Sequence, residues 1–400
     1  MKVIFTFPGL AHYLTAQLNK LSSKGIEVAA IIPQSKSASV GSGVHMAKDA
    51  EGFRVIEGNE KKSFIGKPIF ENLEEILETE HPDILVIGWP YALDLVFNTS
   101  LKNTIKRLGI KLIYKGIPFN LPKRNEIIKF YHAGKYSGDE SAEQFKPSFV
   151  GLLKFYVITV LRGFYLRKVD AHVYYINEAK DIVKSYGVEP SKVFITYNSP
   201  DTDLHLKTYK EILQEPLMLK PDVKRIIHVG RLVKWKRVDL LIEAYRKLKL
   251  IHTDLELIVV GGGPELENLK AQAGNDASII FTGAIYDAKV LGKYLKESSV
   301  YVLAGMGGLS INEAMCYAKP IVCSIADGTE KEIVREGENG YFFENGNLGS
   351  LTEKINLILS DAELCKRMGE KSLKIIEEEV NLDIIAERYV KAFEYVLMCS

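Results

Sequence analysis

The feature that most constrains the fold is an alternation, along most of the chain, of short apolar runs with amphipathic stretches of helical period. Several of the runs, Asp83–Trp89 and Ser299–Leu303 among them, are apolar on both faces. A strand of this kind belongs inside a parallel sheet whose two sides are covered by helices. Because strands that alternate with helices form βαβ units, the sequence predicts an α/β fold with doubly wound, Rossmann-like sheets.

About six such strands lie in each half of the chain, which predicts two similar domains that face each other across a cleft. The expected strands are Lys2–Phe7, Glu27–Pro33, Asp83–Trp89, Lys111–Lys115, Ala171–Ile176 and Val193–Tyr197, then Arg225–Val229, Leu255–Val260, Ser278–Thr282, Ser299–Leu303, Pro320–Cys323 and Tyr341–Phe343. A polar, irregular segment from Leu204 to Asp222 separates the two runs. We therefore expect an N-terminal domain over 1–203, a C-terminal domain over 204–380, and a closing helix over 381–400 that packs back on the N-terminal domain.

The formal net charge of +1 conceals a basic stretch between Lys102 and Lys168, where 14 Lys and Arg residues stand against 4 Asp and Glu residues. Such a stretch attracts anions, so it suits lipid headgroups, a phosphorylated acceptor or nucleic acid, and it equally suits an ordinary solvated surface. No recognised nucleic-acid-binding module accompanies it, which argues against nucleic acid as the partner.

The cysteines and the N-terminus indicate a cytoplasmic protein. The four cysteines form no CxxC pair and have no histidine at metal-ligand spacing, so we expect reduced thiols. The first residues, MKVIFTFPGL, lead into an expected strand without a signal-peptide pattern. No stretch of eighteen apolar residues is free of charge, so we expect no transmembrane helix.

Several strand ends in the second half carry residues suited to an anionic ligand. Ligands of open α/β sheets bind at the carboxyl ends of the strands, and bare backbone N–H groups at a helix N-terminus attract anions. Arg231 and Lys236 follow one strand, and the glycine-rich corners 261–263 and 305–308 follow two others. Glu313 comes just behind the last corner, where a carboxylate can accept two hydrogen bonds from a vicinal diol such as that of ribose.

Each of these features also has a purely structural explanation. Glycines after strands often serve tight turns or close packing, and single Arg or Lys residues in loops are commonly solvated. Ser310 and Glu313 form an S-x-x-E pattern, as in a capping box whose acid only satisfies backbone donors. The GGGP sequence lacks the G-x-G-x-x-G spacing of a dinucleotide site. The convergence of several corners on one sheet edge is what favours a ligand site.

The second half resembles the donor domain of family 4 glycosyltransferases, which have the GT-B fold. The resemblance rests on GRLVKWKRVDLLIEA, LIVVGGGPE, FTGAIYDAKVLGKYLKESSVYV and GLSINEAMCYAKPIVCS, which occur between Arg225 and Ile358 in the family's order and spacing. FTFPGLAHYLTAQLNKLSSKGIEVAAIIP is similar to the first βαβ unit of the family's acceptor domain. The segments from about Val40 to Glu80 and from Pro122 to Pro147 match little.

The resemblance implies specific roles for residues at this sheet edge. Arg231 and Lys236 would clamp the diphosphate of a nucleotide sugar and stabilise the leaving group, which makes them the catalytic candidates. Glu313 would bind the ribose hydroxyls. The other donor-binding candidates are Gly307, Gly308, Leu309 and Ser310 for the phosphates and the sugar, Ala284 and Ile285 for the nucleobase, and Gly9 in the N-terminal loop that closes on the donor.

Two positions depart from the family pattern, and both concern the surroundings of the hexose. An acid commonly stands eight residues before the ribose-binding one, and that position here is Gly305. A histidine commonly follows the strand equivalent to Lys111–Lys115, whereas this chain has Lys115-Gly116 there and offers His12 as only a loose substitute.

The function implied is that of a retaining, metal-independent enzyme. It would move a hexose or N-acetylhexosamine from a nucleotide sugar, foremost a UDP-sugar, to a glycan or lipid-linked acceptor in the synthesis of a surface polysaccharide, lipopolysaccharide or glycolipid. No DxD-like metal site is visible, so no metal or other cofactor is expected. A sugar phosphorylase, a hydrolase or an epimerase on the same fold is an alternative, and so is a non-catalytic sugar-nucleotide-binding protein, which Gly305 would suit.

The segment SFVGLLKFYVITVLRGFYLRK, residues 148–168, has two interpretations. It joins aromatic and apolar residues with Lys154, Arg162, Arg167 and Lys168, so it could lie on an anionic membrane surface beside a lipid-linked acceptor. It could instead be a helix packed on the sheet. The two interpretations can hold for different faces of one helix, and the first would place the protein at the inner face of the membrane.

Overall fold

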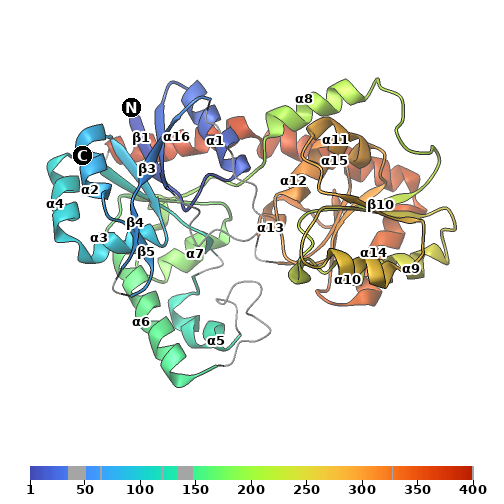
Figure 1. Cartoon of the computed structure of the whole chain (residues 1–400), viewed down its shortest axis with the longest axis horizontal. Helices are drawn as coiled ribbons and strands as arrows, with labels where there is room; N and C mark the ends of the chain where they lie inside the picture. Colours follow the sequence, from blue (N-terminus) through green and yellow to red (C-terminus); the bar gives the residue numbers. More distant parts are fainter. Residues whose placement is uncertain (35–50, 64, 119–120, 134–146, 327, 399–400) are drawn as a thin grey trace. The chain divides into compact units, whose positions relative to one another are not determined.

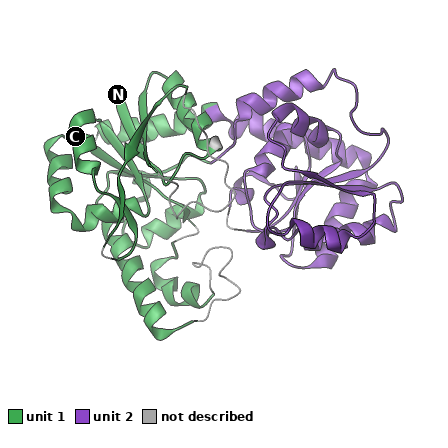
Figure 2. Cartoon of the chain, viewed as in Figure 1, with its two compact units in different colours: residues 1–197, 383–400 green, residues 198–382 purple. Residues whose placement is uncertain are grey.

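The computed structural model describes residues 1–34, 51–63, 65–118, 121–133, 147–326 and 328–398. The chain divides into two compact units, coloured separately in Figure 2. Unit 1 comprises Met1–Tyr197 and Asp383–Ser400, and unit 2 comprises Asn198–Leu382. Each unit contains one parallel sheet surrounded by helices (Figure 1), so the predicted α/β fold with two Rossmann-like units is confirmed.

The sheet of unit 1 is buried on both faces. Its strand order is β3 (Arg54–Gly58), β2 (Glu27–Pro33), β1 (Lys2–Thr6), β6 (Ile84–Gly88), β7 (Lys111–Lys115), β8 (Ala171–Tyr174) and β9 (Val193–Ile195). Along β1, Val3 and Phe5 belong to one buried apolar cluster and Ile4 belongs to the other. Successive side chains of a strand point to opposite faces, so a run that is apolar throughout fits only a sheet covered on both sides.

Helices of unit 1 cover both faces of this sheet. The helices of the unit are α1 (His12–Ser23), α2 (Leu73–Glu80), α3 (Asp94–Phe97), α4 (Thr99–Arg107), α5 (Ile127–His132), α6 (Phe149–Leu166), α7 (Glu178–Lys184) and α16 (Leu382–Met398), with 3-10 turns η1 (Tyr91–Leu93), η3 (Arg124–Glu126) and η4 (Pro190–Lys192). The closing helix α16 packs in the cluster that contains β1, and its Phe393 ring lies 6.4 Å from the ring of Phe5.

The sheet of unit 2 has the strand order β12 (Ile279–Gly283), β11 (Glu256–Val260), β10 (Arg225–Val229), β13 (Val300–Leu303), β14 (Ile321–Ser324) and β15 (Gly340–Phe343). Its helices are α8 (Thr202–Ile212), α9 (Val238–Lys249), α10 (Leu266–Ala273), α11 (Ala288–Lys296), α12 (Ser310–Cys316), α13 (Glu330–Ile333), α14 (Leu348–Ser360) and α15 (Ala362–Glu379), with the 3-10 turn η5 (Lys234–Lys236). The order of strands reverses between β10 and β13, and such a switch point is where open α/β sheets bind ligands.

The structure corrects the expected domain boundary. The segment from Leu204, expected to be irregular, begins inside α8, whose N-cap Asp201 accepts a hydrogen bond from the Leu204 N–H (3.0 Å). The predicted boundary at 203/204 therefore falls within a helix, and the units divide after Tyr197 instead. Polar composition concealed this helix, because its buried face includes His205 and two threonines rather than an apolar stripe.

Three strands of unit 1 were not predicted. Strand β3 lies at the edge of the sheet and is mostly exposed, and β4 (Glu60–Lys62) and β5 (Pro68–Phe70) form a separate short hairpin. Edge and hairpin strands need little apolar sequence, so their pattern resembles that of a loop. All twelve segments expected to be strands overlap a strand of the structure.

Replacing Phe393 by Ala tests the integration of α16 into unit 1. Phe393 is fully buried, so Phe393→Ala should lower the free energy of unfolding of unit 1 by about 3–5 kcal/mol, measured by urea titration. Leu397→Ala, on the same helix but 37% exposed, is the matched control and should cost far less. Equal effects of the two changes would mean that α16 is not part of this core.

Candidate functional site

The loops that follow β10 and β13 meet at the switch point of unit 2. The two strands are neighbours in the sheet, with Ile226 paired to Val300, so their loops leave the same edge. The Met306 N–H donates to the Trp235 carbonyl (3.0 Å). The Lys236 ammonium donates to the carbonyl oxygens of Met306 (2.9 Å) and Gly307 (2.6 Å). The structure thus brings Lys236, 8% exposed, onto the glycine-rich corner.

Close backbone contact explains why Gly305 carries no side chain. A Cβ at this position would overlap the Trp235 carbonyl oxygen and lie 2.8 Å from the Lys236 Cα. The Gly305 carbonyl in turn accepts a hydrogen bond from the Ser324 hydroxyl at the end of β14 (3.1 Å). The position where family members commonly carry an acid is therefore closed by the Trp235–Lys236 backbone in this chain.

The two glycines that follow Met306 lie against charged side chains. A Cβ on Gly308 would lie 3.0 Å from the Lys236 Nζ, and a Cβ on Gly307 would overlap the carboxylate of Glu330. Glu330 is fully buried, and its Oε1 accepts hydrogen bonds from the N–H groups of Ala326 (3.1 Å) and Gly328 (2.8 Å). Its Oε2 has no hydrogen-bond partner among the described residues. Sequence reasoning missed Glu330, because an acid at the start of a short helix is an ordinary feature.

The glycines at 261–263 have the structural explanation instead. A Cβ on Gly261 would overlap the carbonyl oxygen of Gly230, and one on Gly263 would overlap that of Leu232. The Leu232 N–H also donates to the Gly262 carbonyl (2.9 Å). This corner therefore packs backbone to backbone on the loop that carries Arg231, which accounts for Gly261 and Gly263 without a ligand, whereas a Cβ on Gly262 would meet no other atom within 4 Å.

The capping-box explanation of Glu313 is wrong. Helix α12 begins at Ser310, so Ser310 is its first residue and Leu309 is the N-cap. The Ser310 hydroxyl lies 2.7 Å from the hydroxyl of Tyr301 on β13. Tyr301 also donates to the Val229 carbonyl (3.3 Å), so these hydroxyls tie α12 to the ends of β13 and β10.

Glu313 is an ionisable group held in a largely dry environment. Its side chain is 18% exposed, and burial raises the pKa of its carboxyl group to about 7. The Nε2 of His205 on α8 lies 3.7 Å from its Oε1, and the Nδ1 of His205 lies 3.1 Å from the Tyr317 hydroxyl. His205 was missed because α8 was not expected. The sequence did contain a signal for this helix. Thr202, His205 and Thr208 recur every three residues, as on one face of a helix, and Asp201 before them is a suitable N-cap.

The remaining predicted site residues are placed as follows. Arg231 is half-buried beside Trp235, with its Cζ 5.7 Å from the centre of the indole ring. Ala284 is exposed and Ile285 half-buried in the loop after β12, at the far edge of the unit 2 sheet. Gly9 lies in unit 1, in the loop between β1 and α1, and its predicted role in donor binding stays a prediction.

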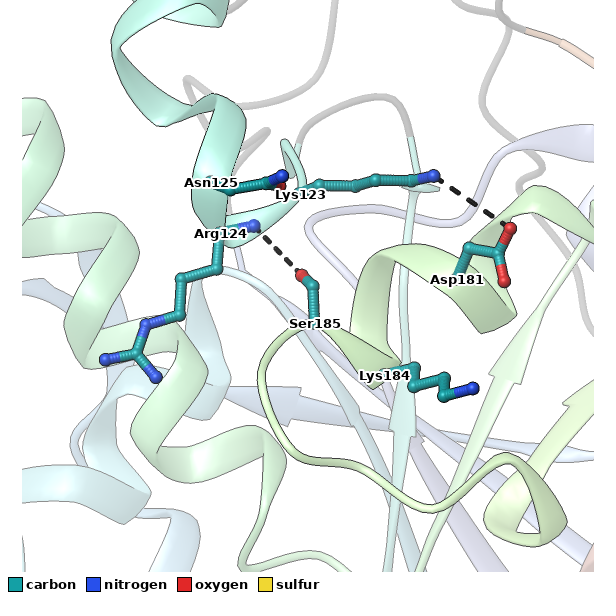
Figure 3. Close-up of a pocket in the computed structure, with 6 residues that line it drawn as sticks. All are labelled: Lys123, Arg124, Asn125, Asp181, Lys184 and Ser185. Atoms are coloured by element: carbon teal, nitrogen blue, oxygen red, sulfur yellow. Dashed lines mark hydrogen bonds and ion pairs between the residues drawn. The ribbon is translucent and has the colours of Figure 1, made fainter.

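Unit 1 contains a basic hollow that the sequence did not single out. The hollow has a volume of about 830 Å³ and lies between η3 and the C-terminal part of α7, as Figure 3 shows. The Arg124 N–H donates to the Ser185 hydroxyl (2.9 Å), and the Lys123 ammonium lies 3.9 Å from an Asp181 oxygen. The lining residues are Lys123, Arg124, Asn125, Asp181, Lys184 and Ser185.

Comparison with known proteins connects this sheet edge to a family. The family described as glycosyl transferases group 1 matches residues 210–375, which include β10 to β15 and the corner loops. An uncharacterised glycosyltransferase of Methanocaldococcus jannaschii is 30% identical over 68% of this chain and 69% of its own length. The N-acetylgalactosamine-N,N'-diacetylbacillosaminyl-diphospho-undecaprenol 4-alpha-N-acetylgalactosaminyltransferase of Campylobacter jejuni is 28% identical over 48% of this chain. This chain spans about half of that relative's length.

A solved structure shows the same fold over the whole chain. The Anabaena protein HepE, in complex with UDP, has a TM-score of 0.65 at 17% identity and covers 98% of this chain and 100% of its own. The fold is therefore that of the GT-B class. The chain belongs to the group 1 glycosyl transferases and is a family 4-like enzyme.

The raised pKa of Glu313 predicts a pH-dependent stability. The folded protein holds the proton to about pH 7, whereas the unfolded chain releases it near pH 4.5, so this group's contribution to stability is present below pH 4.5 and is lost as the pH rises through 7. Glu313→Gln should therefore be more stable than the wild type at pH 8 by about 1–3 kcal/mol, since each tenfold change in proton affinity corresponds to about 1.4 kcal/mol.

Urea unfolding of both proteins at pH 5 and pH 8 measures this difference. The two stabilities should approach each other at the lower pH. A difference that is the same at both values would show that Glu313 titrates normally in the folded protein.

Proposed function

We propose that this glycosyltransferase transfers a hexose or N-acetylhexosamine from a UDP-sugar to a glycan or lipid-linked acceptor. The observation that carries the proposal is the Lys236 ammonium, held by two carbonyl groups against the glycine-rich corner at 305–308. A point charge beside bare backbone at the carboxyl edge of a parallel sheet suits the diphosphate of a nucleotide sugar. HepE, which shares the fold, was solved with UDP.

The charge of the leaving group gives Lys236 and Arg231 their catalytic role. As the bond between the anomeric carbon and the diphosphate oxygen breaks, negative charge grows on the diphosphate and the sugar becomes oxocarbenium-like. A cation already fixed in place stabilises that charge without having to reorganise. The ammonium of Lys236 is fixed by its hydrogen bonds, and the guanidinium of Arg231 can hold phosphate oxygens with two parallel N–H groups.

The rest of the donor extends along the same edge of the unit 2 sheet. Glu313 accepts hydrogen bonds from the ribose hydroxyls, and the backbone of Gly307, Gly308, Leu309 and Ser310 approaches the phosphates and the sugar. Ala284 and Ile285 contact the base. Strands β12 and β13 are three positions apart in the sheet, or roughly 14 Å at the usual strand spacing, which a nucleotide can bridge.

The transfer proceeds with retention of anomeric configuration and without a metal ion. The acceptor hydroxyl attacks the anomeric carbon from the side that the diphosphate leaves, and its proton passes to the leaving phosphate oxygen. No protein nucleophile is then required.

The acceptor is a growing surface glycan, such as a polysaccharide or lipopolysaccharide, or its lipid-linked precursor. The Campylobacter relative is named for an undecaprenol diphosphate acceptor. The enzyme works in the cytoplasm, and a lipid-linked acceptor would bring it to the inner face of the membrane. A sugar phosphorylase is the alternative, and it would release sugar phosphate from a glycan and phosphate. A non-catalytic protein would bind the donor without turnover.

Lys236→Ala tests the diphosphate clamp. It should lower turnover by about 10²-fold or more, because it removes one preorganised charge from the transition state. Lys234→Ala is the matched control, since Lys234 lies in the same 3-10 turn with an exposed side chain. Steady-state release of UDP from a UDP-sugar measures both. Equal turnover in the two variants would remove Lys236 from the mechanism.

Glu313→Ala tests the ribose contact. Two hydrogen bonds to a charged group are lost, so UDP should bind at least about 10-fold more weakly, measured by calorimetry. The same substitution should hardly change the affinity for 2′,3′-dideoxy-UDP, which lacks both hydroxyls. A similar loss for both ligands would place the effect elsewhere than at the ribose.

A further inference from the structure

Helix α6 presents a continuous apolar stripe to solvent. At 3.6 residues per turn, its exposed apolar and aromatic side chains fall within an arc of about 120° along the whole helix. They are 41–80% exposed and include Phe149, Val150, Leu153, Val157, Val160 and Phe164. In Figure 1 the N-terminal half of α6 extends beyond the sheet of unit 1 together with α5. A stripe of this length on one helix marks an interaction surface.

The opposite face of α6 is fixed in the core of unit 1. Thr159, Tyr165 and Leu166 are at most 1% exposed. The Arg162 guanidinium is buried and stacks 4.3 Å from the centre of the Trp89 ring. Among the described residues, α6 is the helix whose length and composition would allow it to cross a membrane. Spanning would pull Arg162 and Tyr165 out of this core, so the structure suits a helix lying in the plane of a membrane surface.

The charges around the stripe are of one sign. From residue 147 to residue 168 the chain contains no acid, and Lys154, Arg167 and Lys168 are exposed. The Lys168 ammonium lies 4.9 Å and the Arg167 Cζ 6.0 Å from the centre of the Phe164 ring. Cations therefore stand at the end of the apolar stripe. Apolar side chains bordered by lysine and arginine match the acyl boundary and the anionic headgroups of a lipid leaflet.

We propose that α6 docks unit 1 on an anionic membrane. The apolar stripe enters the boundary between headgroups and acyl chains, and Lys154, Arg167 and Lys168 contact the headgroups. The inference deepens the proposed function, on which it rests for the lipid-linked acceptor, by naming the surface that brings the enzyme to that acceptor. It does not depend on the donor site, because α6 belongs to unit 1 and the donor residues other than Gly9 belong to unit 2.

Co-sedimentation of the full chain with vesicles tests the proposal. The protein should bind vesicles of phosphatidylcholine and phosphatidylglycerol at low salt, and alkaline carbonate should release it. Leu153→Asp/Val157→Asp should weaken binding by about tenfold or more. Lys154→Ala and Lys168→Ala should each weaken vesicle binding by about fivefold, and added salt should weaken it as well.

Leu250→Asp/Ile251→Asp is the matched control. These side chains of unit 2 are 84% and 63% exposed, and their replacement should leave vesicle binding unchanged. Melting temperature and UDP affinity should be unchanged in every variant, which separates docking from folding and from donor binding.

Three results would overturn the proposal: absent binding to anionic vesicles, equal loss in the control, or resistance to carbonate extraction. A dimer that dissociates in Leu153→Asp/Val157→Asp without any vesicle binding would assign the stripe to a second copy of the chain. In each case normal UDP binding would leave the proposed function standing.

Discussion

The contact between Lys236 and the carbonyl groups of Met306 and Gly307 is the interaction on which the site depends. It places a buried cation beside a corner in which Gly305, Gly307 and Gly308 carry no side chain, and it requires the loops after β10 and β13 to touch. Gly305 permits that contact, because any side chain there would collide with the Trp235–Lys236 backbone. The acid that related enzymes carry at this position is therefore incompatible with the way the two loops pack in this chain.

Besides the buried cation of Lys236, the site contains a buried carboxyl group, that of Glu313. A carboxyl group with a pKa near 7 is poorly solvated, so hydroxyl donors from a ligand would compensate for the water it lacks. His205 lies within 3.7 Å of it and is itself held by Tyr317, which connects the carboxylate to helix α8. Glu330, against Gly307, places a second buried carboxylate at the same corner. The acids near this corner are thus Glu313 on α12 and Glu330 on α13, whereas position 305, where the family pattern has an acid, is a glycine.

The sequence predicted the central strands well because a buried parallel strand must be apolar on both faces, as Ile84–Gly88 is. It also identified the corner that holds Lys236. It failed where folding depends on little apolar sequence, as in the polar helix α8 and the edge strand β3. It did not find His205 or Glu330, since the contact of His205 with Glu313 and that of Glu330 with Gly307 arise only when separate segments pack together. The exposed face of α6 was recognisable as apolar and basic, but its division into a core face and a solvent face required the structure.

A crystal structure of the protein with an intact UDP-sugar tests the central claim most directly. The account predicts the diphosphate within hydrogen-bonding distance of the Lys236 ammonium and the Arg231 guanidinium, with the ribose hydroxyls on Glu313. It would be contradicted by a nucleotide bound away from the loops after β10 and β13. It would also be contradicted by a diphosphate at this edge that leaves Lys236 bonded only to the carbonyl groups of Met306 and Gly307.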